Sequence, residues 1–322
     1  MKQGTEKFSS KDIADKVEFY GATIKTGAGF DNATVTVYTL NKYLEPILAL
    51  AEQVIKKPTF PEEELNIYTQ NRKAKLSVQM QKNEFMANRK IREVLFGADH
   101  VYGYGPTTEA LDNISVEELR AFHKANYTSD HCMVVVSGKM DDSLLPLLNT
   151  HFGGADWKSP SSNGSQIFHD EEPSSNMNIY EEREDSVQCS IRIGRKLFNK
   201  THPDFHGMLV LNTIFGGYFS SRLMNNIRED KGFTYGIYSV LNSRKNGGYW
   251  YITTEVGSHV CEAAIAEIYK EIDILKSQLV PDEELELVRN YMLGSILSQL
   301  DGPFNIAKTV KGLITFGLKL EY

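Results

Sequence analysis

PEEEL at residues 61–65 and PDEEL at residues 281–285 are two nearly identical acidic helix starts, 220 residues apart. Other short motifs repeat around them in the same order. The triplet "FSS" begins at Phe8 and again at Phe219, and a Tyr-Gly pair begins at Tyr20 and again at Tyr235, at separations of 211 and 215 residues. Self-similarity in a fixed order indicates a duplicated unit, and the slowly growing separation indicates small loop insertions.

The residues between these motifs predict the structure of the unit. A polar cap at Ser10 leads into a helix with Ile13 and Val17 on one face, and Gly21 can end it. A strand follows, and residues 33–40 ("ATVTVYTL") form a second, antiparallel strand. After an amphipathic helix over residues 44–55, Thr59 is expected to cap the PEEEL helix.

The second half repeats this order of elements. We expect a helix from Ser221, a strand from Phe233, a turn at "RKNGGY" (244–249), a strand at 250–256 and a helix from His259 before PDEEL. Each unit then combines hairpin strands with a layer of helices. The fold class is therefore α+β, with two duplicated domains that each pack a mainly antiparallel sheet on helices.

The ends of the two units differ. Before the second "FSS" there is an extra strand, "VQCSIRIG" (187–194), and an extra helix, whereas only seven residues precede Phe8. The first unit continues through a capping box at Ser115 and Glu118 to a strand at 131–138, which the second unit lacks before Tyr322. We expect a truncated first domain at 1–155, a linker at 156–176 rich in Ser, Asn and Pro, and a C-terminally incomplete second domain at 177–322.

The composition excludes some classes of function. The net charge of −7 and pI near 5.7 give no electrostatic support for binding nucleic acid. No apolar run approaches the roughly 18 residues of a membrane span, so the expectation is a soluble protein, cytoplasmic or periplasmic. The cysteines, Cys132, Cys189 and Cys261, are expected to be buried small apolar residues, with redox or metal-binding thiols as the alternative.

Several motifs together resemble the pitrilysin or insulinase family of zinc peptidases. The most specific is "SSRLMNNIREDKGFTYGIYS" (220–239), which is similar to the family's second-domain signature, and "PTFPEEEL" (58–65) is also family-like. The resemblance implies duplicated α+β domains. In active members a His-x-x-Glu-His zinc motif precedes the Gly-Thr pair that is here Gly4 and Thr5, and the printed sequence contains no such motif.

The same resemblance implies a third zinc ligand, a Glu on the PEEEL helix about 71 residues beyond Gly4, where this sequence has Lys75. Residues 70–82 contain neither Asp nor Glu, so a modest shift of register finds no substitute ligand. The chain is therefore similar to the zinc-less subunits or halves of the family. No cofactor is expected in this chain, and zinc is expected in a catalytic partner that carries His-x-x-Glu-His.

The resemblance also implies a role for Arg228 and Tyr235, seven residues apart. In the partner half of the family, such a pair faces the zinc across an enclosed chamber and binds the peptide backbone. From the sequence alone Arg228 lies in the last turn of a helix that Gly232 ends, and Tyr235 is the third residue of the next strand. The alternative is structural: Arg228 complements a helix C-terminus and Tyr235 fills a strand face.

Two other patterns in the sequence could indicate binding sites. His202 and His206 have metal-ligand spacing at a helix start capped by Thr201, but no third ligand lies nearby in the sequence. The glycine-rich stretch at 96–105 ("FGADHVYGYG") lacks the Lys and Ser/Thr of a phosphate-binding loop.

The resulting hypothesis is a non-catalytic half of a zinc metallopeptidase, inactive alone, in a heterodimer or two-part chain. It closes the chamber, binds extended peptide and supplies Arg228 and Tyr235 to the partner's zinc site. The alternative is a structural scaffold subunit of the same fold that handles no peptide. A third possibility is an active peptidase with substitute ligands.

Overall fold

The computed structural model describes residues 1–158, 178–184 and 186–322. These residues form two compact units: Met1–Ser77 with Pro106–Ile167, and Val78–Gly105 with Phe168–Tyr322, each counted over its described residues. Helix α3 (Glu62–Met80) contributes to both units. The domain limits expected from the motifs, 1–155 and 177–322, stay a prediction, and residues 159–176 of the expected linker lie outside the described residues.

The first unit contains a two-stranded antiparallel sheet and helices. Strands β1 (Thr23–Ala28) and β2 (Ala33–Tyr38) pair from Thr23 opposite Tyr38 to Ala28 opposite Ala33. Ile13, Ile24, Leu50 and Val54 form its buried apolar cluster. Its helices are α1 (Ser10–Phe19), η1 (Asn41–Tyr43), α2 (Leu44–Lys56), most of α3, α5 (Thr108–Asp112), α6 (Val116–Asn126), η2 (Ser129–His131), α7 (Leu144–Phe152) and η3 (Ala155–Trp157).

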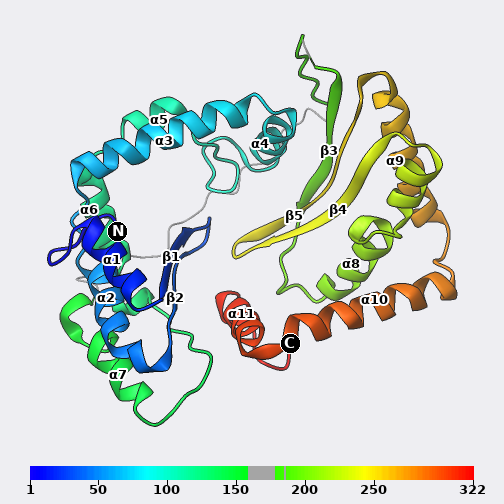
Figure 1. Cartoon of the computed structure of the whole chain (residues 1–322). Helices are drawn as coiled ribbons and strands as arrows, with labels where there is room; N and C mark the ends of the chain where they lie inside the picture. Colours follow the sequence, from blue (N-terminus) through cyan, green and yellow to red (C-terminus); the bar gives the residue numbers. More distant parts are fainter. Residues whose placement is uncertain (159–177, 185) are drawn as a thin grey trace. The chain divides into compact units, whose positions relative to one another are not determined.

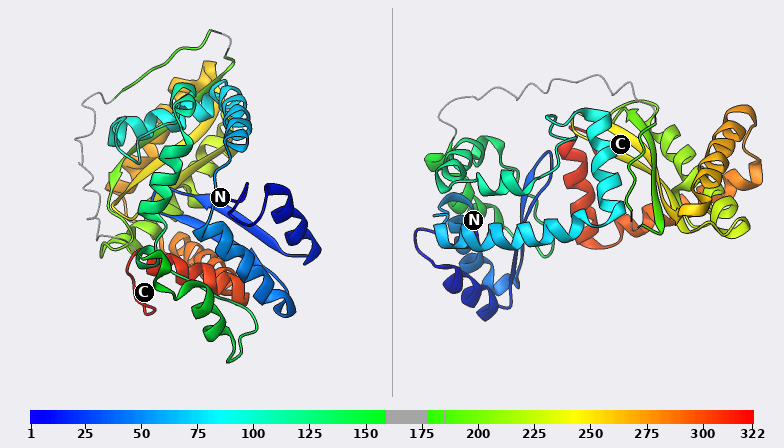
Figure 2. Two further views of the ribbon diagram at one scale, coloured as in Figure 1. Left: turned by 90° about the vertical axis from the view of Figure 1, so that its left-hand side faces the viewer. Right: turned by 90° about the horizontal axis from the view of Figure 1, so that it is seen from above.

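The second unit contains a three-stranded antiparallel sheet in the order β3–β5–β4 (Figure 1). Its strands are β3 (Gln188–Leu197), β4 (Thr234–Arg244) and β5 (Gly247–Gly257). Its helices are α4 (Asn83–Phe96), α8 (Phe205–Asn212), η4 (Thr213–Gly217), η5 (Met224–Asp230), η6 (Ser258–Val260), α9 (Cys261–Ser277), α10 (Asp282–Leu300) and α11 (Gly302–Thr315). The consecutive helices α10 and α11 contact each other (Figures 1 and 2).

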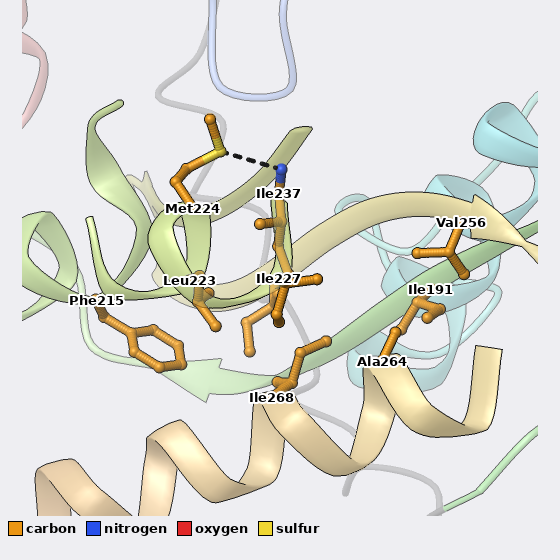
Figure 3. Packing of buried hydrophobic residues seen from close by; sticks show 10 residues of the cluster. Ile191, Phe215, Leu223, Met224, Ile227, Ile237, Val256, Ala264 and Ile268 are labelled. Atoms are coloured by element: carbon orange, nitrogen blue, oxygen red, sulfur yellow. Dashed lines mark hydrogen bonds between the residues drawn. The ribbon is translucent and has the colours of Figure 1, made fainter. Parts of the chain in front are cut away.

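The core of the second unit lies between its sheet and the helices η5 and α9 (Figure 3). Ile237 and Ile252 from the strands, Ile227 from η5 and Ile268 from α9 are all fully buried. The backbone N–H of Ile237 donates to Sδ of Met224 over 3.4 Å, which links β4 to η5. Burying a large aliphatic side chain stabilises the fold by about 1.5–3 kcal/mol, so this cluster fixes the positions of η5 and β4 relative to each other.

These elements confirm the α+β fold class with antiparallel sheets. The element order helix, strand, strand, helix, acidic-start helix occurs as α1, β1, β2, α2, α3 and again as η5, β4, β5, α9, α10. The superposition of the two halves stays a prediction. The capping box at Ser115 and Glu118 is confirmed: the Ser115 hydroxyl accepts from Glu118 N at 3.2 Å, and the Glu118 carboxylate accepts from Ser115 N at 2.9 Å.

Three local predictions were wrong. Residues 132–137 are not a strand, because no strand of the described residues offers them a hydrogen-bonded ladder. The cap of α1 is Ser9 rather than Ser10, because Asp12 completes a capping box with Ser9. Thr59 does not cap α3, because the backbone turns at Phe60, with φ of 50°, and the helix begins only at Glu62.

Candidate functional site

The candidate site is built on η5 and the start of β4, within the second unit. Arg228 lies in η5, which is a π-helix. Short π-helical segments occur frequently at functional sites. The helix ends as expected from the glycine: Gly232 has φ of +65°, and its N–H donates to Arg228 O at 3.1 Å. Strand β4 begins at Thr234, so Tyr235 is its second residue rather than its third.

Tyr235 lies in an irregularity of β4. Thr234 pairs with Val256 and Ile237 pairs with Thr254, whereas Tyr235 and Gly236 have no partner in the ladder. One extra residue in a strand bends it and redirects the neighbouring side chains. The Tyr235 side chain is 94% exposed, so it does not fill a strand face. The packing alternative for Tyr235 is therefore wrong.

Two threonines hold this bulge. The Thr234 hydroxyl donates to Glu255 O at 2.6 Å and accepts from Gly236 N at 3.1 Å. The buried Thr254 hydroxyl donates to Gly236 O at 3.0 Å. These bonds satisfy backbone groups that the ladder leaves unpaired, and they fix the direction in which the chain presents Tyr235. Sequence reasoning missed both threonines, although Gly236 inside a strand pattern is a signal for a bulge that could have pointed to them.

The Arg228 guanidinium lies near two aromatic rings. Its Cζ is 4.5 Å from the ring centroid of Phe219 and 5.9 Å from that of Tyr235. A guanidinium at this distance is attracted by the ring quadrupole. The sequence placed Phe219 only in the repeated "FSS" motif and gave it no role. The structure brings Phe219 together with the two predicted site residues.

The hydrogen-bonding capacity of Arg228 is only partly used within the described residues. Its Nη1 is 3.0 Å from Oε1 of Glu229, but the angle is not that of a hydrogen bond, and Nη1 has no other hydrogen-bond partner there. A guanidinium carries five N–H donors in a fixed plane. Nη1 itself is buried, but the Arg228 side chain is 26% exposed, so its accessible N–H groups can donate to a further acceptor that approaches the exposed ring of Tyr235.

Two polar contacts anchor the segment that carries Arg228. Arg222 donates to both carboxylate oxygens of Glu284, Nε to Oε1 at 2.8 Å and Nη2 to Oε2 at 2.6 Å, and this hydrogen-bonded carboxylate raises the pKa of Arg222. Asn226 donates to Glu271 of α9 at 2.7 Å and to Glu267 at 3.1 Å, and the latter bond lowers the pKa of Glu267. Glu284 belongs to the second acidic helix start, PDEEL, which therefore has a structural role beside this site.

Two protein-family models match this chain. The model of the "Peptidase M16 inactive domain" matches residues 113–292, and that of "Insulinase (Peptidase family M16)" matches residues 1–101. The chain belongs to peptidase family M16. The M16 relationship accounts for the resemblance carried by residues 220–239.

Individual M16 relatives are distant in sequence. An "Uncharacterized zinc protease YmxG" of Bacillus subtilis is 23% identical over 93% of this chain and 72% of its own length. A "Non-peptidase homolog YmxG" of Helicobacter pylori is 21% identical over 92% of this chain and 68% of its own length. The crystal structure of a peptidase M16 inactive domain from Pseudomonas fluorescens aligns with a TM-score of 0.90 at 24% identity, over 99% of this chain and 77% of that one.

Zinc does not fit the residues that the structure describes in this M16 chain. Lys75 lies exposed on α3, where the family resemblance implies the third ligand, so it brings a cation where zinc needs an anionic oxygen. Among the described residues no three His, Cys, Asp or Glu side chains lie close enough together to hold a metal ion. Residues 70–82, all described, supply no carboxylate.

The two histidines of "THPDFH" do not form the start of one helix. Helix α8 begins at Phe205 with Asp204 at its cap position, so the predicted cap at Thr201 was wrong. The Thr201 hydroxyl instead donates to the side chain of Asn199 at 2.6 Å. The His202 ring stacks on Phe198 with centroids 4.1 Å apart, outside the helix that contains His206.

The remaining predictions concern the glycine-rich loop, the cysteines and the membrane. Residues 97–105 follow α4 as a loop, and Gly103 is tightly packed: a Cβ there would lie 2.0 Å from Gly97 O. Cys132 is exposed and the other two cysteines are half-buried, so the expectation of three buried cysteines was wrong. In the described part of the chain, each helix is too short or too polar to span a bilayer.

Proposed function

We propose that this chain is a non-catalytic half of an M16 zinc metallopeptidase. Together with a catalytic M16 subunit or half carrying His-x-x-Glu-His, it closes a chamber, binds extended peptide and directs Arg228 and Tyr235 toward the partner's zinc site. The single observation that carries the proposal is the exposed Tyr235 side chain on a bulge fixed by hydrogen bonds, with the Arg228 guanidinium 5.9 Å from its ring.

The chemistry follows from the donors that this chain offers. An extended peptide presents carbonyl oxygens, which are hydrogen-bond acceptors, and the scissile carbonyl gains negative charge during hydrolysis. A tyrosine hydroxyl donates one hydrogen bond, and a guanidinium donates several and brings a positive charge. Donors whose positions are already fixed need not reorganise when charge develops on the carbonyl oxygen. Such donors lower the activation barrier because they bind the charged oxygen of the transition state more strongly than the neutral carbonyl.

The arrangement around Arg228 supports preorganisation. Phe219 lies against the guanidinium, and two contacts anchor the chain: that of Arg222 with Glu284 just before η5 and that of Asn226 with α9 within η5. A flexible arginine would lose side-chain entropy on binding, about 1.5–2 kcal/mol if it were fully ordered. A guanidinium held in advance has already lost much of that freedom.

The test uses the two-part enzyme reconstituted from this chain and its catalytic M16 partner. We expect Tyr235→Phe and Arg228→Ala each to lower kcat on the order of 10²-fold, because each removes a donor to developing charge. Tyr269→Phe is the matched control, since Tyr269 is a half-exposed tyrosine on α9, away from η5 and β4 in the sequence. The melting temperature and the affinity for the partner should change little in all three variants.

If both site variants keep near-normal turnover while they remain assembled, the peptide-handling role is wrong. The scaffold role, in which the chain supports assembly and handles no peptide, then takes its place. A loss of turnover that tracks a loss of assembly likewise favours the scaffold role.

A further inference from the structure

Two of the three cysteines lie next to each other in the second unit. Cys189 is the second residue of β3 and Cys261 is the first residue of α9, and their Sγ atoms are 2.7 Å apart. Both side chains are half-buried against the core cluster of this unit, whereas Cys132 is exposed. Seventy-two positions of sequence separate the pair, so the fold rather than local sequence brings the two sulfurs together.

The backbone around the pair is fixed by regular structure on both sides. Cys189 pairs with Val256 of β5 in the sheet. One residue later β5 ends, and the short 3-10 helix Ser258–Val260 leads directly into α9. The buried side chains of Ala264 and Ile268 then hold α9 against Ile191 of β3. The closeness of the sulfurs therefore follows from the packing of α9 on the sheet.

We propose that Cys189 and Cys261 form an intramolecular disulfide when the chain meets a disulfide oxidant such as oxidised glutathione. One cysteine thiolate attacks the glutathione disulfide and releases one glutathione thiolate, which gives a mixed disulfide. The second cysteine thiolate then displaces the remaining glutathione. Two protein thiols and one oxidised glutathione give one protein disulfide and two reduced glutathione molecules.

The geometry favours the internal bond over a stable glutathione adduct. A disulfide has an S–S distance of about 2.05 Å, so bond formation requires the sulfurs to approach by roughly 0.65 Å more, a shift within reach of side-chain rotation. A mixed disulfide would have to accommodate a tripeptide at a half-buried position. Burial, followed by the contact with Cys189, raises the pKa of Cys261 to about 12, so oxidation should become faster as the pH rises.

The disulfide would cross-link the elements that support the candidate site, although the proposal does not depend on that site's function. Cys189, Val256 and Thr234 are paired across the three strands, and Thr234 directly precedes Tyr235. Helix α9 also accepts the hydrogen bonds of Asn226 from η5. Oxidation would thus restrain the sheet end and the helix between which η5 and the bulge are held.

The whole chain is equilibrated in glutathione buffers that range from fully reduced to strongly oxidising. Acid then stops thiol–disulfide exchange, and the free thiols are titrated in the denatured protein. We expect the thiols of Cys189 and Cys261 to be lost together, whether or not the exposed Cys132 also forms a mixed disulfide with glutathione, and peptide mapping to find the Cys189 and Cys261 peptides joined. Cys132→Ser should still lose two thiols, whereas Cys189→Ser and Cys261→Ser should lose none to an internal bond. The melting temperature of the oxidised wild type should exceed that of the reduced protein.

Other outcomes would overturn the proposal. Three titratable thiols in the most oxidising buffer would show that the pair does not close. Glutathione adducts at Cys189 or Cys261 without a cross-linked peptide would show that the second step fails. A cross-link that includes Cys132, or one that joins two chains, would show that this pair is not the preferred site.

Discussion

Replacing Glu284 with alanine should destabilise the second unit far more than the equivalent change destabilises the first. Glu284 accepts two charge-assisted hydrogen bonds from Arg222, at 2.8 and 2.6 Å, with side chains 25% and 16% exposed. Glu64, at the same place in the first acidic helix start, accepts one hydrogen bond at 2.7 Å from the amide of the exposed Gln3. The two residues share a motif but not an environment, so they form a matched pair.

The magnitude follows from these environments. Exposed ion pairs contribute about 0.2–1 kcal/mol, whereas breaking a fully buried pair costs about 3–5 kcal/mol. The Arg222–Glu284 pair is bidentate and mostly shielded, so Glu284→Ala should cost about 2–3 kcal/mol of unfolding free energy. Glu64→Ala should cost about 0.5 kcal/mol, because a neutral donor at the surface recovers its bond from water.

Urea unfolding of the full chain measures both changes if one unit is observed at a time. Trp250 lies in β5 of the second unit and Trp157 in the first, so a Trp157→Phe background reports Glu284→Ala in the second unit alone, and a Trp250→Phe background reports Glu64→Ala in the first. A double-mutant cycle with Arg222→Met then gives the coupling energy of the pair. Equal effects of Glu284→Ala and Glu64→Ala, or a coupling below about 0.5 kcal/mol, would refute the reasoning.

Two further predictions concern acid stability and metal binding. Burial lowers the pKa of His123, whose Nε2 lies 2.7 Å from Ile55 O, so the unfolded chain binds a proton there more readily than the folded one. The free energy of unfolding should therefore fall as the pH drops below the pKa of histidine in the unfolded chain, about 6.5. In His123→Gln, the melting temperature should depend less on pH between pH 7 and 5. The chain purified alone should hold no stoichiometric zinc and cleave no peptide; about one tightly held zinc per chain by elemental analysis, lost on mutating residues of this chain, would contradict the prediction.

The sequence predicted best where local chemistry decides the structure. The capping box of Ser115 and Glu118 consists of side-chain hydrogen bonds between residues three apart. Gly21 and Gly232 end their helices with positive φ, which depends only on the local backbone. The paired strands followed from alternating residues around short turns. These features gave the order of elements in both units.

The failures have a tertiary cause. Residues 132–137 have the composition of a strand, but a strand forms only where another backbone pairs with it. The sequence of the segment alone does not tell whether such a partner strand is present. The cap position of the helix containing His206 is Asp204, three residues after the predicted cap Thr201, whose hydroxyl is bonded to Asn199 instead. Phe219 entered the site only when the fold brought it to Arg228.

The bulge in β4 separates what the chain needs to fold from what it presents to solvent. Tyr235 makes no ladder pair and is 94% exposed, so folding depends on the threonine hydroxyls beneath it and hardly on the phenol itself. In a library of variants at position 235, selection for folded protein should accept nearly any side chain, and selection for activity in the assembled enzyme should accept very few. A strand irregularity of this kind lets a protein exchange one surface side chain for another without repacking its core, and so lets function diverge while the architecture stays the same.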